Sequence, residues 1–187
     1  ADCTGHGVPG AMISVVCNNG LNRSVREHGL TEPGKILDKT REIVIQEFSK
    51  SEEEVADGMD ISLCSIEGNK LQWAGANNPL WIIRKGELLE TLPNRQPIGK
   101  YPSPEPFLTH EITLEKEDRL YLFSDGFPDQ FGGVKGKKYK VKNLKKLLIS
   151  ISQNPMNEQQ GMLNTVFEKW RSDLEQIDDI CILGLKI

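Results

Sequence analysis

Three acidic positions could carry chemistry, because each lies at the end of a predicted strand. Asp2 precedes a glycine-rich turn, Asp125 follows the apolar segment 121–123 after one serine, and the pair Asp178-Asp179 directly precedes the apolar segment 180–183. Carboxylates on such rigid stems supply the oxygen ligands that a hard divalent cation requires. An Asp before a glycine also commonly forms a turn, and an Asp before a helix commonly caps it. Taken singly, each carboxylate leaves the choice between metal ligand and turn residue open.

The turn at residues 4–7, Thr-Gly-His-Gly, precedes a predicted helix. Backbone N–H groups at such a helix start could hold an anion. Two glycines near a helix start are common, however, so the turn alone indicates little. His6 fits a local hydrogen bond or a cap better than acid–base catalysis.

Hydrophobic periodicity predicts the elements that must position these residues. Apolar residues repeat every four positions over 9–25 and again over 33–48, which predicts two helices, the second capped by Thr31. A polar, acidic loop is expected at 49–57. Alternation then predicts strands at 59–66, 71–76, 80–84, 87–92, 107–114 and 119–124, and the chain closes with helices at 143–152 and 158–176 and a strand at 180–187.

Glycine-containing pairs at 68–69 and 85–86, and the pair Asn77-Asn78, fall where hairpin turns are expected. A long irregular loop is expected at 94–106, which holds four prolines. Helices, then a run of antiparallel strands, then helices and a last strand indicate an α+β fold with helices stacked on sheet.

Composition limits the class of protein. The chain has 187 residues, 37% hydrophobic and 27% charged, with a net charge of -4, which predicts a single domain over residues 1–187. No apolar run reaches the length of a membrane helix, and the acidic balance argues against nucleic acid or anionic lipid as the main partner. The basic stretch at 135–146 is local.

The four cysteines, Cys3, Cys17, Cys64 and Cys181, have no CxxC spacing, which argues against a structural zinc site. Their apolar surroundings favour reduced thiols and a cytoplasmic location.

Five motifs occur in a fixed order along the chain. They are residues 2–11 (DCTGHGVPGA), 57–60 (DGMD), 75–79 (GANNP), 124–133 (SDGFPDQFGG) and 178–179 (DD). In this order they resemble the SpoIIE/RsbU-type serine phosphatases of the PPM (protein phosphatase 2C-like) superfamily. The resemblance covers essentially the whole chain and implies an antiparallel β-sandwich flanked by helices in α-β-β-α layers.

The resemblance also implies a site for two Mn²⁺ or Mg²⁺ ions. Asp2 would bridge the ions, Cys3 would lend its backbone carbonyl, and Asp125 and Asp178 would be further ligands, with Asp179 beside them. Asp2, Asp125 and Asp178 would form the catalytic centre. A metal-activated water would attack a phosphoserine or phosphothreonine without a covalent phosphoenzyme.

The chain departs from the family pattern in ways that shape these expectations. The family carries an upstream strand pair with a Gly-Gly-Asp motif, so the sandwich is expected to lack its N-terminal strands and one acidic residue. His6 is displaced relative to the DGHG form of the eukaryotic relatives, which argues against a general-acid role. Residues 57–60 are expected to shape the site without binding metal, and Asp129 could reach a metal or the substrate.

The predicted function is therefore a phosphoprotein phosphatase domain of a bacterial signalling protein. Its substrate class by resemblance is a phosphoserine on an anti-sigma-factor antagonist, with no nucleic acid or membrane contact. One alternative is a catalytically inactive regulatory module that binds a partner. The other is a structural oligomerisation domain, because a truncated sandwich exposes strand edges that favour a homodimer.

Overall fold

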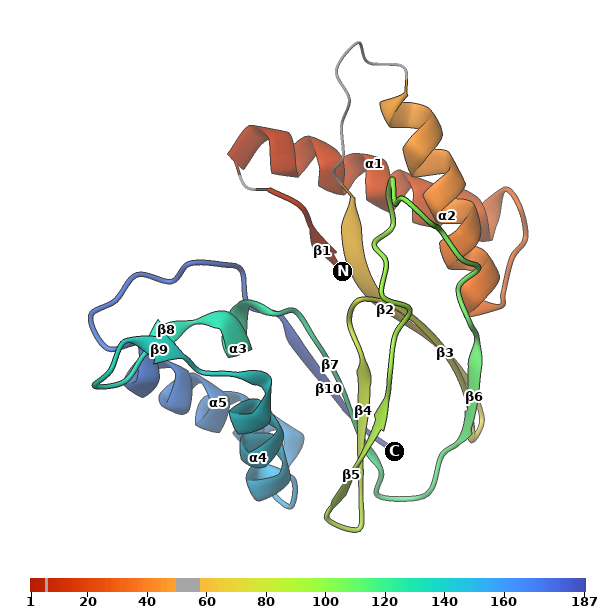
Figure 1. Ribbon diagram of the computed structural model, residues 1–187. Coiled ribbons are helices and arrows are strands. Elements are labelled where there is room, and N and C mark those ends of the chain that lie inside the picture. The colour runs from red at the N-terminus through yellow and green to blue at the C-terminus, as the bar shows by residue number, and fades with distance from the viewer. Residues whose placement is uncertain (6, 50–57) are drawn as a thin grey trace. The chain divides into compact units, whose positions relative to one another are not determined.

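The computed structural model describes residues 1–5, 7–49 and 58–187, and the chain divides into two compact units (Figure 1). The first unit comprises Ala1–Pro79 and Leu92–Leu114, and the second comprises Leu80–Thr91 and Glu115–Ile187. His6 and the predicted loop beyond Ser49 lie outside the described residues.

The first unit places two helices on a four-stranded antiparallel sheet (Figure 1). Its sheet has the order β1-β2-β3-β6, and its elements are β1 (Asp2–Cys3), α1 (Gly7–Arg26), α2 (Pro33–Phe48), β2 (Met59–Glu67), β3 (Lys70–Ala76) and β6 (His110–Thr113). Helix α1 buries Ile13, Cys17 and Gly20, whose spacing of three and four residues keeps them on one face. That face joins Leu37 and Val44 of α2 in the core of this unit.

The second unit is built on another four-stranded antiparallel sheet, of order β10-β7-β4-β5. Its elements are β4 (Leu80–Arg84), β5 (Glu87–Thr91), β7 (Arg119–Phe123), α3 (Gly126–Asp129), β8 (Phe131–Gly132), β9 (Lys137–Lys138), α4 (Val141–Ile151), α5 (Met156–Arg171) and β10 (Ile182–Lys186). Aromatic side chains fill its core, with Trp81 against Phe123 at 4.2 Å and Phe127 against Phe167 at 5.2 Å between ring centroids. The two units together confirm the predicted α+β class with antiparallel sheets.

A buried ion pair fixes the start of β7. Asp118 is fully buried, and its two carboxylate oxygens accept hydrogen bonds from the Arg84 guanidinium at 2.9 and 2.6 Å. The backbone N–H of Glu115 donates a third at 2.8 Å. Burial alone would raise the pKa of Asp118, but these hydrogen bonds outweigh it and hold the pKa below its ordinary value. The pair therefore ties the end of β4 to the turn that leads into β7.

Two hairpin turns were predicted correctly and one was not. β2 pairs with β3 across Gly68, and β4 pairs with β5 across Lys85 and Gly86, all three with positive φ. Asn77 and Asn78 close no hairpin, because β3 and β4 belong to different sheets.

Several element boundaries differ from prediction by one or two residues, and two boundaries and one cap differ in a way that the structure explains. Residues 107–109 do not join the sheet, because their backbone N–H groups bond to side chains. The N–H of Phe107 donates to Asp38, and the N–H of Leu108 donates to Asn94. Helix α5 ends at Arg171 rather than continuing to residue 176, because the next residue, a serine, has a φ of 52°. The N-cap of α2 is Glu32, not Thr31.

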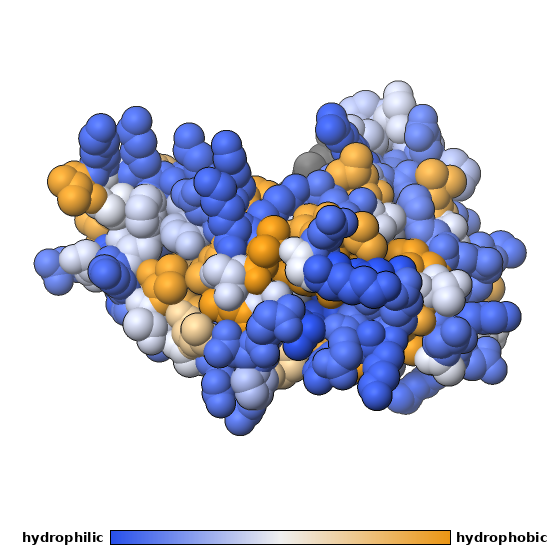
Figure 2. Space-filling view, turned by 90° about the horizontal axis from the view of Figure 1, so that it is seen from below, coloured by the Kyte–Doolittle hydropathy of each residue, from blue (hydrophilic) through white to orange (hydrophobic). Residues whose placement is uncertain are grey.

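Polar side chains predominate on one face of the chain (Figure 2). On the face drawn in Figure 2, hydrophilic residues predominate and hydrophobic side chains show between them, in agreement with a charged fraction of 27%. Among the helices in the described parts of the chain, none is long and apolar enough to cross a membrane.

Candidate functional site

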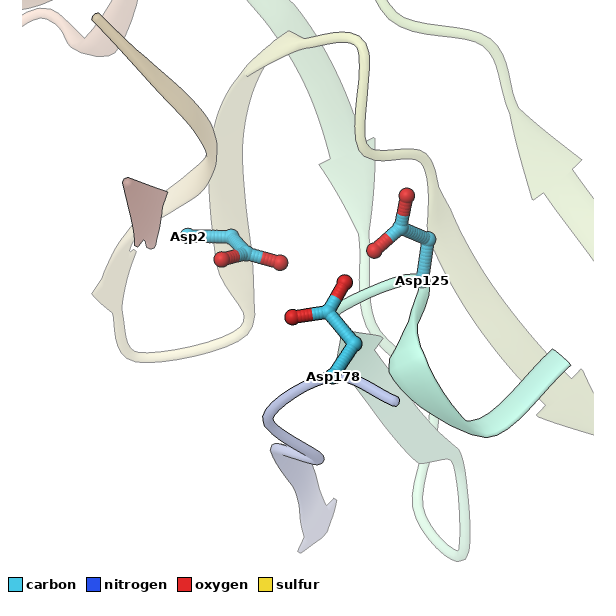
Figure 3. Close-up of side chains that lie close together, drawn as sticks. All are labelled: Asp2, Asp125 and Asp178. Atoms are coloured by element: carbon cyan, nitrogen blue, oxygen red, sulfur yellow. The ribbon is translucent and has the colours of Figure 1, made fainter. Parts of the chain in front are cut away.

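The second unit brings Asp125 and Asp178 together at one edge of its sheet. Asp125 follows β7 and Asp178 precedes β10, and the two strands are antiparallel neighbours with Phe123 opposite Ile182. The end of β7 and the start of β10 therefore meet. A carboxylate oxygen of Asp125 and one of Asp178 lie within 4.8 Å of each other, and Figure 3 shows both side chains.

Ser124 joins the end of β7 to the start of β10 through hydrogen bonds. Its hydroxyl donates to the backbone carbonyl of Asp179 at 3.1 Å and accepts from the N–H of Cys181 at 3.0 Å. Its own N–H donates to the carbonyl of Cys181 at 2.9 Å. Gly126 permits this approach, since a Cβ atom there would lie 2.3 Å from the carbonyl oxygen of Asp179. Small residues on both sides of Asp125 thus hold its backbone close to that of Asp178.

Gln130 holds the loop that leads into Asp178. Its side chain is fully buried; the amide donates to the carbonyl of Glu175 at 2.8 Å, and its oxygen accepts from the N–H of Ile177 at 3.3 Å. The Gln130 carbonyl also accepts from the Trp170 indole at 3.0 Å. One residue therefore connects the turn after Asp125 with the segment before Asp178. Sequence analysis missed it, because a single glutamine after a short helix carries no distinguishing pattern.

The carboxylates at this edge crowd one another. Burial raises the pKa of Asp125, and the negative charges of Asp178 and Asp129 raise it further, while its own backbone N–H and Lys138 act in the opposite direction. Asp129 pairs with the Lys138 ammonium at 2.6 Å, and its predicted reach to a metal or the substrate stays a prediction.

Asp179 lies beside the pair and contributes through its backbone. Its N–H donates to a carboxylate oxygen of Asp178 at 2.8 Å, which orients that side chain. Its carbonyl accepts the Ser124 hydroxyl. The assignment of its own carboxylate as a ligand stays a prediction.

Asp2 lies in the first unit, on the short strand β1 (Figure 3). It is half-buried and directly opposite Asp60 of β2, whose carboxylate accepts a hydrogen bond from the Asn77 side chain at 2.8 Å. Thr4 anchors the strand by bonds to the backbone of Gly58. Facing residues of an antiparallel pair share one face of the sheet, so Asp60 stands beside Asp2, although its motif was expected only to shape the site.

Cys3 is suited to act through its backbone alone. Its side chain packs against the core of the first unit, where a hydrogen bond with the Cys17 thiol lowers the pKa of Cys3 against the effect of burial. The ligand role predicted for the Cys3 carbonyl stays a prediction. The other two residues singled out from the sequence, His6 and Asp57, lie outside the described part of the chain.

Comparisons with known structures establish the fold. The SiaA-PP2C domain of Pseudomonas aeruginosa is 27% identical with a TM-score of 0.89, covering 99% of this chain and 73% of that one. The RsbU and RsbW domains of a Mycobacterium tuberculosis protein are 18% identical with a TM-score of 0.71, covering 99% and 49%. The chain has the fold of a PPM phosphatase domain, as predicted.

A third solved structure holds the PP2C phosphatase domain and part of the regulatory domain of SpoIIE from Bacillus subtilis. It is 14% identical with a TM-score of 0.70, covering 98% of this chain and 52% of that one. The chain thus spans about half the length of two of these three structures. A search of curated proteins found no match. The model of the stage II sporulation protein E (SpoIIE) family matches residues 1–187, and the chain belongs to that family.

Proposed function

We propose that this chain is the catalytic domain of a metal-dependent phosphoprotein phosphatase that acts on phosphoserine or phosphothreonine. The observation that carries the proposal is the pair Asp125 and Asp178, held within 4.8 Å at two neighbouring strand ends. Family membership supports the reaction class, and the pair supplies the acidic groups that such a reaction needs.

The proposed ligands of two Mn²⁺ or Mg²⁺ ions are five residues, with Asp2 as the bridging group. They are Asp2, Cys3 through its carbonyl, Asp125, Asp178 and Asp179. The donor set fits these metals, because it consists of oxygens, which hard divalent cations prefer. The raised pKa of Asp125 fits as well, since a bound cation would offset both the burial and the carboxylate repulsion that raise it. When bound, two such ions would activate a water and neutralise the phosphoryl oxygens.

The residues of the chain itself would orient these carboxylates. Ser124 and Gly126 fix the distance between the two strand ends, and the Asp179 N–H holds one oxygen of Asp178. Preorganised ligands need little rearrangement when a charged ligand arrives. The proposed catalytic residues are Asp2, Asp125 and Asp178.

The biological setting is part of the same proposal. The substrate would be a phosphoserine protein, an anti-sigma-factor antagonist, in a bacterial cytoplasm. Homodimerisation through a strand edge is also proposed, and among the described strands β10 lies at the edge of its sheet with Leu183 and Leu185 exposed.

Hydrolysis of p-nitrophenyl phosphate, with and without Mn²⁺, tests the proposed reaction. It should be measured on residues 1–187 and on the protein extended upstream. We expect Mn²⁺-dependent hydrolysis in the extended protein at least, because the resemblance implies a further acidic residue there. Absence of Mn²⁺-dependent hydrolysis from both forms would favour a regulatory module that binds a partner without catalysis.

Gln130 provides a second test, through metal binding rather than turnover. Gln130→Met keeps the volume of the side chain and removes its bonds to Glu175 and Ile177, which frees the loop before Asp178. We expect Mn²⁺ affinity, measured by calorimetric titration, to fall about 10–100-fold, as it does when groups that orient metal ligands are lost.

The matched control for Gln130→Met is Gln160→Met, at an exposed position on α5. The control should bind Mn²⁺ like the parent. Equal affinity in Gln130→Met and Gln160→Met, with both variants folded by circular dichroism, would contradict the positioning role of Gln130.

A further inference from the structure

The second unit carries a concentration of lysines that the proposed reaction does not use. Residues 130–157 contain no acidic side chain, although the whole chain has a net charge of -4. Five lysines on the β8–β9 hairpin and the start of α4 are exposed, and together they are called the basic surface: Lys135, Lys137, Lys138, Lys140 and Lys142.

The hairpin that carries the basic surface is fixed to the core of its unit. The N–H of Gly133 donates to the Trp170 carbonyl at 2.8 Å, and a Cβ atom on Gly132 would lie 2.0 Å from that oxygen. Tyr139, directly after β9, packs edge-on against the Trp170 ring at 5.2 Å between centroids. These contacts give the lysines a defined place beside α5.

That place is next to the proposed metal ligands of the same unit. The Lys138 ammonium bonds to the Asp129 carboxylate at 2.6 Å. Asp129 is the last residue of α3, the short helix whose N-cap is Asp125. The basic surface therefore begins one helical turn away from Asp125.

Lys140 adopts a backbone conformation that a lysine does not favour. Its φ is 76° and its ψ is 142°, in a region that glycine enters freely and other residues enter only with strain. Lys140 directly precedes α4, and its N–H donates to the carbonyl of Pro128 at 2.7 Å. A glycine at this position would adopt the same conformation without strain.

We propose that the basic surface binds an acidic segment of the phosphoprotein substrate, next to the phosphorylated residue; this inference rests on the proposed function. Charge complementarity favours a carboxylate-rich partner. A peptide fits better than a nucleic acid for two reasons. Exposed Phe131, Val134 and Val141 lie among the lysines and would contact apolar side chains, and the net charge of -4 opposes a long polyanion.

Two synthetic phosphoserine peptides test this inference. In one the phosphoserine is flanked by glutamates, and in the other by glutamines. Binding to the metal-free protein is followed by fluorescence anisotropy. We expect the glutamate peptide to bind at least about fivefold more tightly, with a preference that weakens as salt screens the charges. With Mn²⁺ present, KM should differ between the peptides in the same sense.

Charge reversal locates the binding surface. In Lys135→Glu/Lys137→Glu, we expect the preference for the glutamate peptide to disappear, while hydrolysis of p-nitrophenyl phosphate stays unchanged. The matched control, Lys70→Glu/Lys116→Glu, changes the net charge equally at exposed positions outside the basic surface and should keep the preference.

Lys140→Gly separates binding from folding. Relief of the backbone strain should raise the unfolding midpoint by about 2–4 °C. Loss of the ammonium should weaken binding of the glutamate peptide about twofold to fivefold. A lysine kept for structural reasons alone would give a lower midpoint and unchanged binding.

Three results would overturn the inference. They are equal binding of the two peptides, an unchanged preference in Lys135→Glu/Lys137→Glu, and tighter binding of a single-stranded oligonucleotide or of phosphatidylserine vesicles than of the glutamate peptide. Failure of the proposed function shows separately, because p-nitrophenyl phosphate hydrolysis does not depend on the basic surface.

Discussion

Asp125→Asn is expected to reduce Mn²⁺-dependent hydrolysis of p-nitrophenyl phosphate by more than about 100-fold, measured in whichever form of the protein is active. Loss of a group that only orients a metal ligand costs about 10–100-fold, and loss of a charged ligand should cost more. Asparagine keeps the shape of the side chain but removes the negative charge that would face the cations. Mn²⁺ affinity should fall with the activity.

The fold should survive Asp125→Asn for two reasons. Asp125 is the N-cap residue of α3, yet its side chain makes no capping hydrogen bond that asparagine could lose. The substitution also removes a charge that Asp178 and Asp129 repel. The unfolding midpoint of the metal-free variant should therefore equal or exceed that of the parent protein.

Asp173→Asn is the matched control, because it makes the same chemical change at an exposed position of the second unit. It should retain full activity and metal affinity. Activity within about tenfold of the parent in Asp125→Asn would remove Asp125 from the ligand set, since the loss of a group that only orients a metal ligand already reaches that size.

The pairing of strands explains how much of this site the sequence could predict. Apolar runs next to Asp125 and Asp178 identified both residues as ends of strands, because a buried strand reads as a short apolar run. Their proximity depends on β7 and β10 being neighbours, which joins residues 55 positions apart, Ser124 and Asp179. No local pattern encodes that pairing, and only the resemblance to a family suggested it.

The elements that sequence analysis placed wrongly depend on features that apolar periodicity does not encode. Residues 107–109 alternate like a strand, but side chains of Asp38 and Asn94 take the backbone N–H groups that a neighbouring strand would need. In the sequence, the apolar stripe of α5 continues beyond Arg171, where the helix ends. The next residue is a serine, and not the glycine or proline that commonly signals the end of a helix. Gln130 was missed for a related reason. Its hydrogen bonds join the turn after Asp125 to α5 and to the segment before Asp178, and these segments are distant in the sequence.

The second large effect is expected at Asp118, far along the chain from the acidic motifs. Asp118→Asn should destabilise the protein by about 3 kcal/mol, at the lower end of the range for breaking a buried ion pair. The Arg84 guanidinium would lose its buried charge partner but keep an exposed one, Glu115, at 3.0 Å. For a chain of this length, the unfolding midpoint should fall by about 6–12 °C, measured by calorimetry.

Glu115→Gln is the matched control for Asp118→Asn, because both carboxylates pair with Arg84. The Glu115 side chain is 45% exposed, so its ion pair is screened by water and should contribute less than about 1 kcal/mol. A similar loss of stability in the two variants would show that burial does not strengthen the Arg84–Asp118 pair.

The pH dependence of stability follows from the lowered pKa of Asp118. A carboxyl whose pKa is lower in the folded state stabilises the fold above its unfolded pKa of about 3.9, and this contribution is lost as pH falls through the folded value. The stability difference between the parent and Asp118→Asn should therefore be constant above about pH 5 and shrink below about pH 4. A difference that stayed constant down to about pH 2 would mean that the Asp118 charge contributes nothing, and that the variant is destabilised through packing alone.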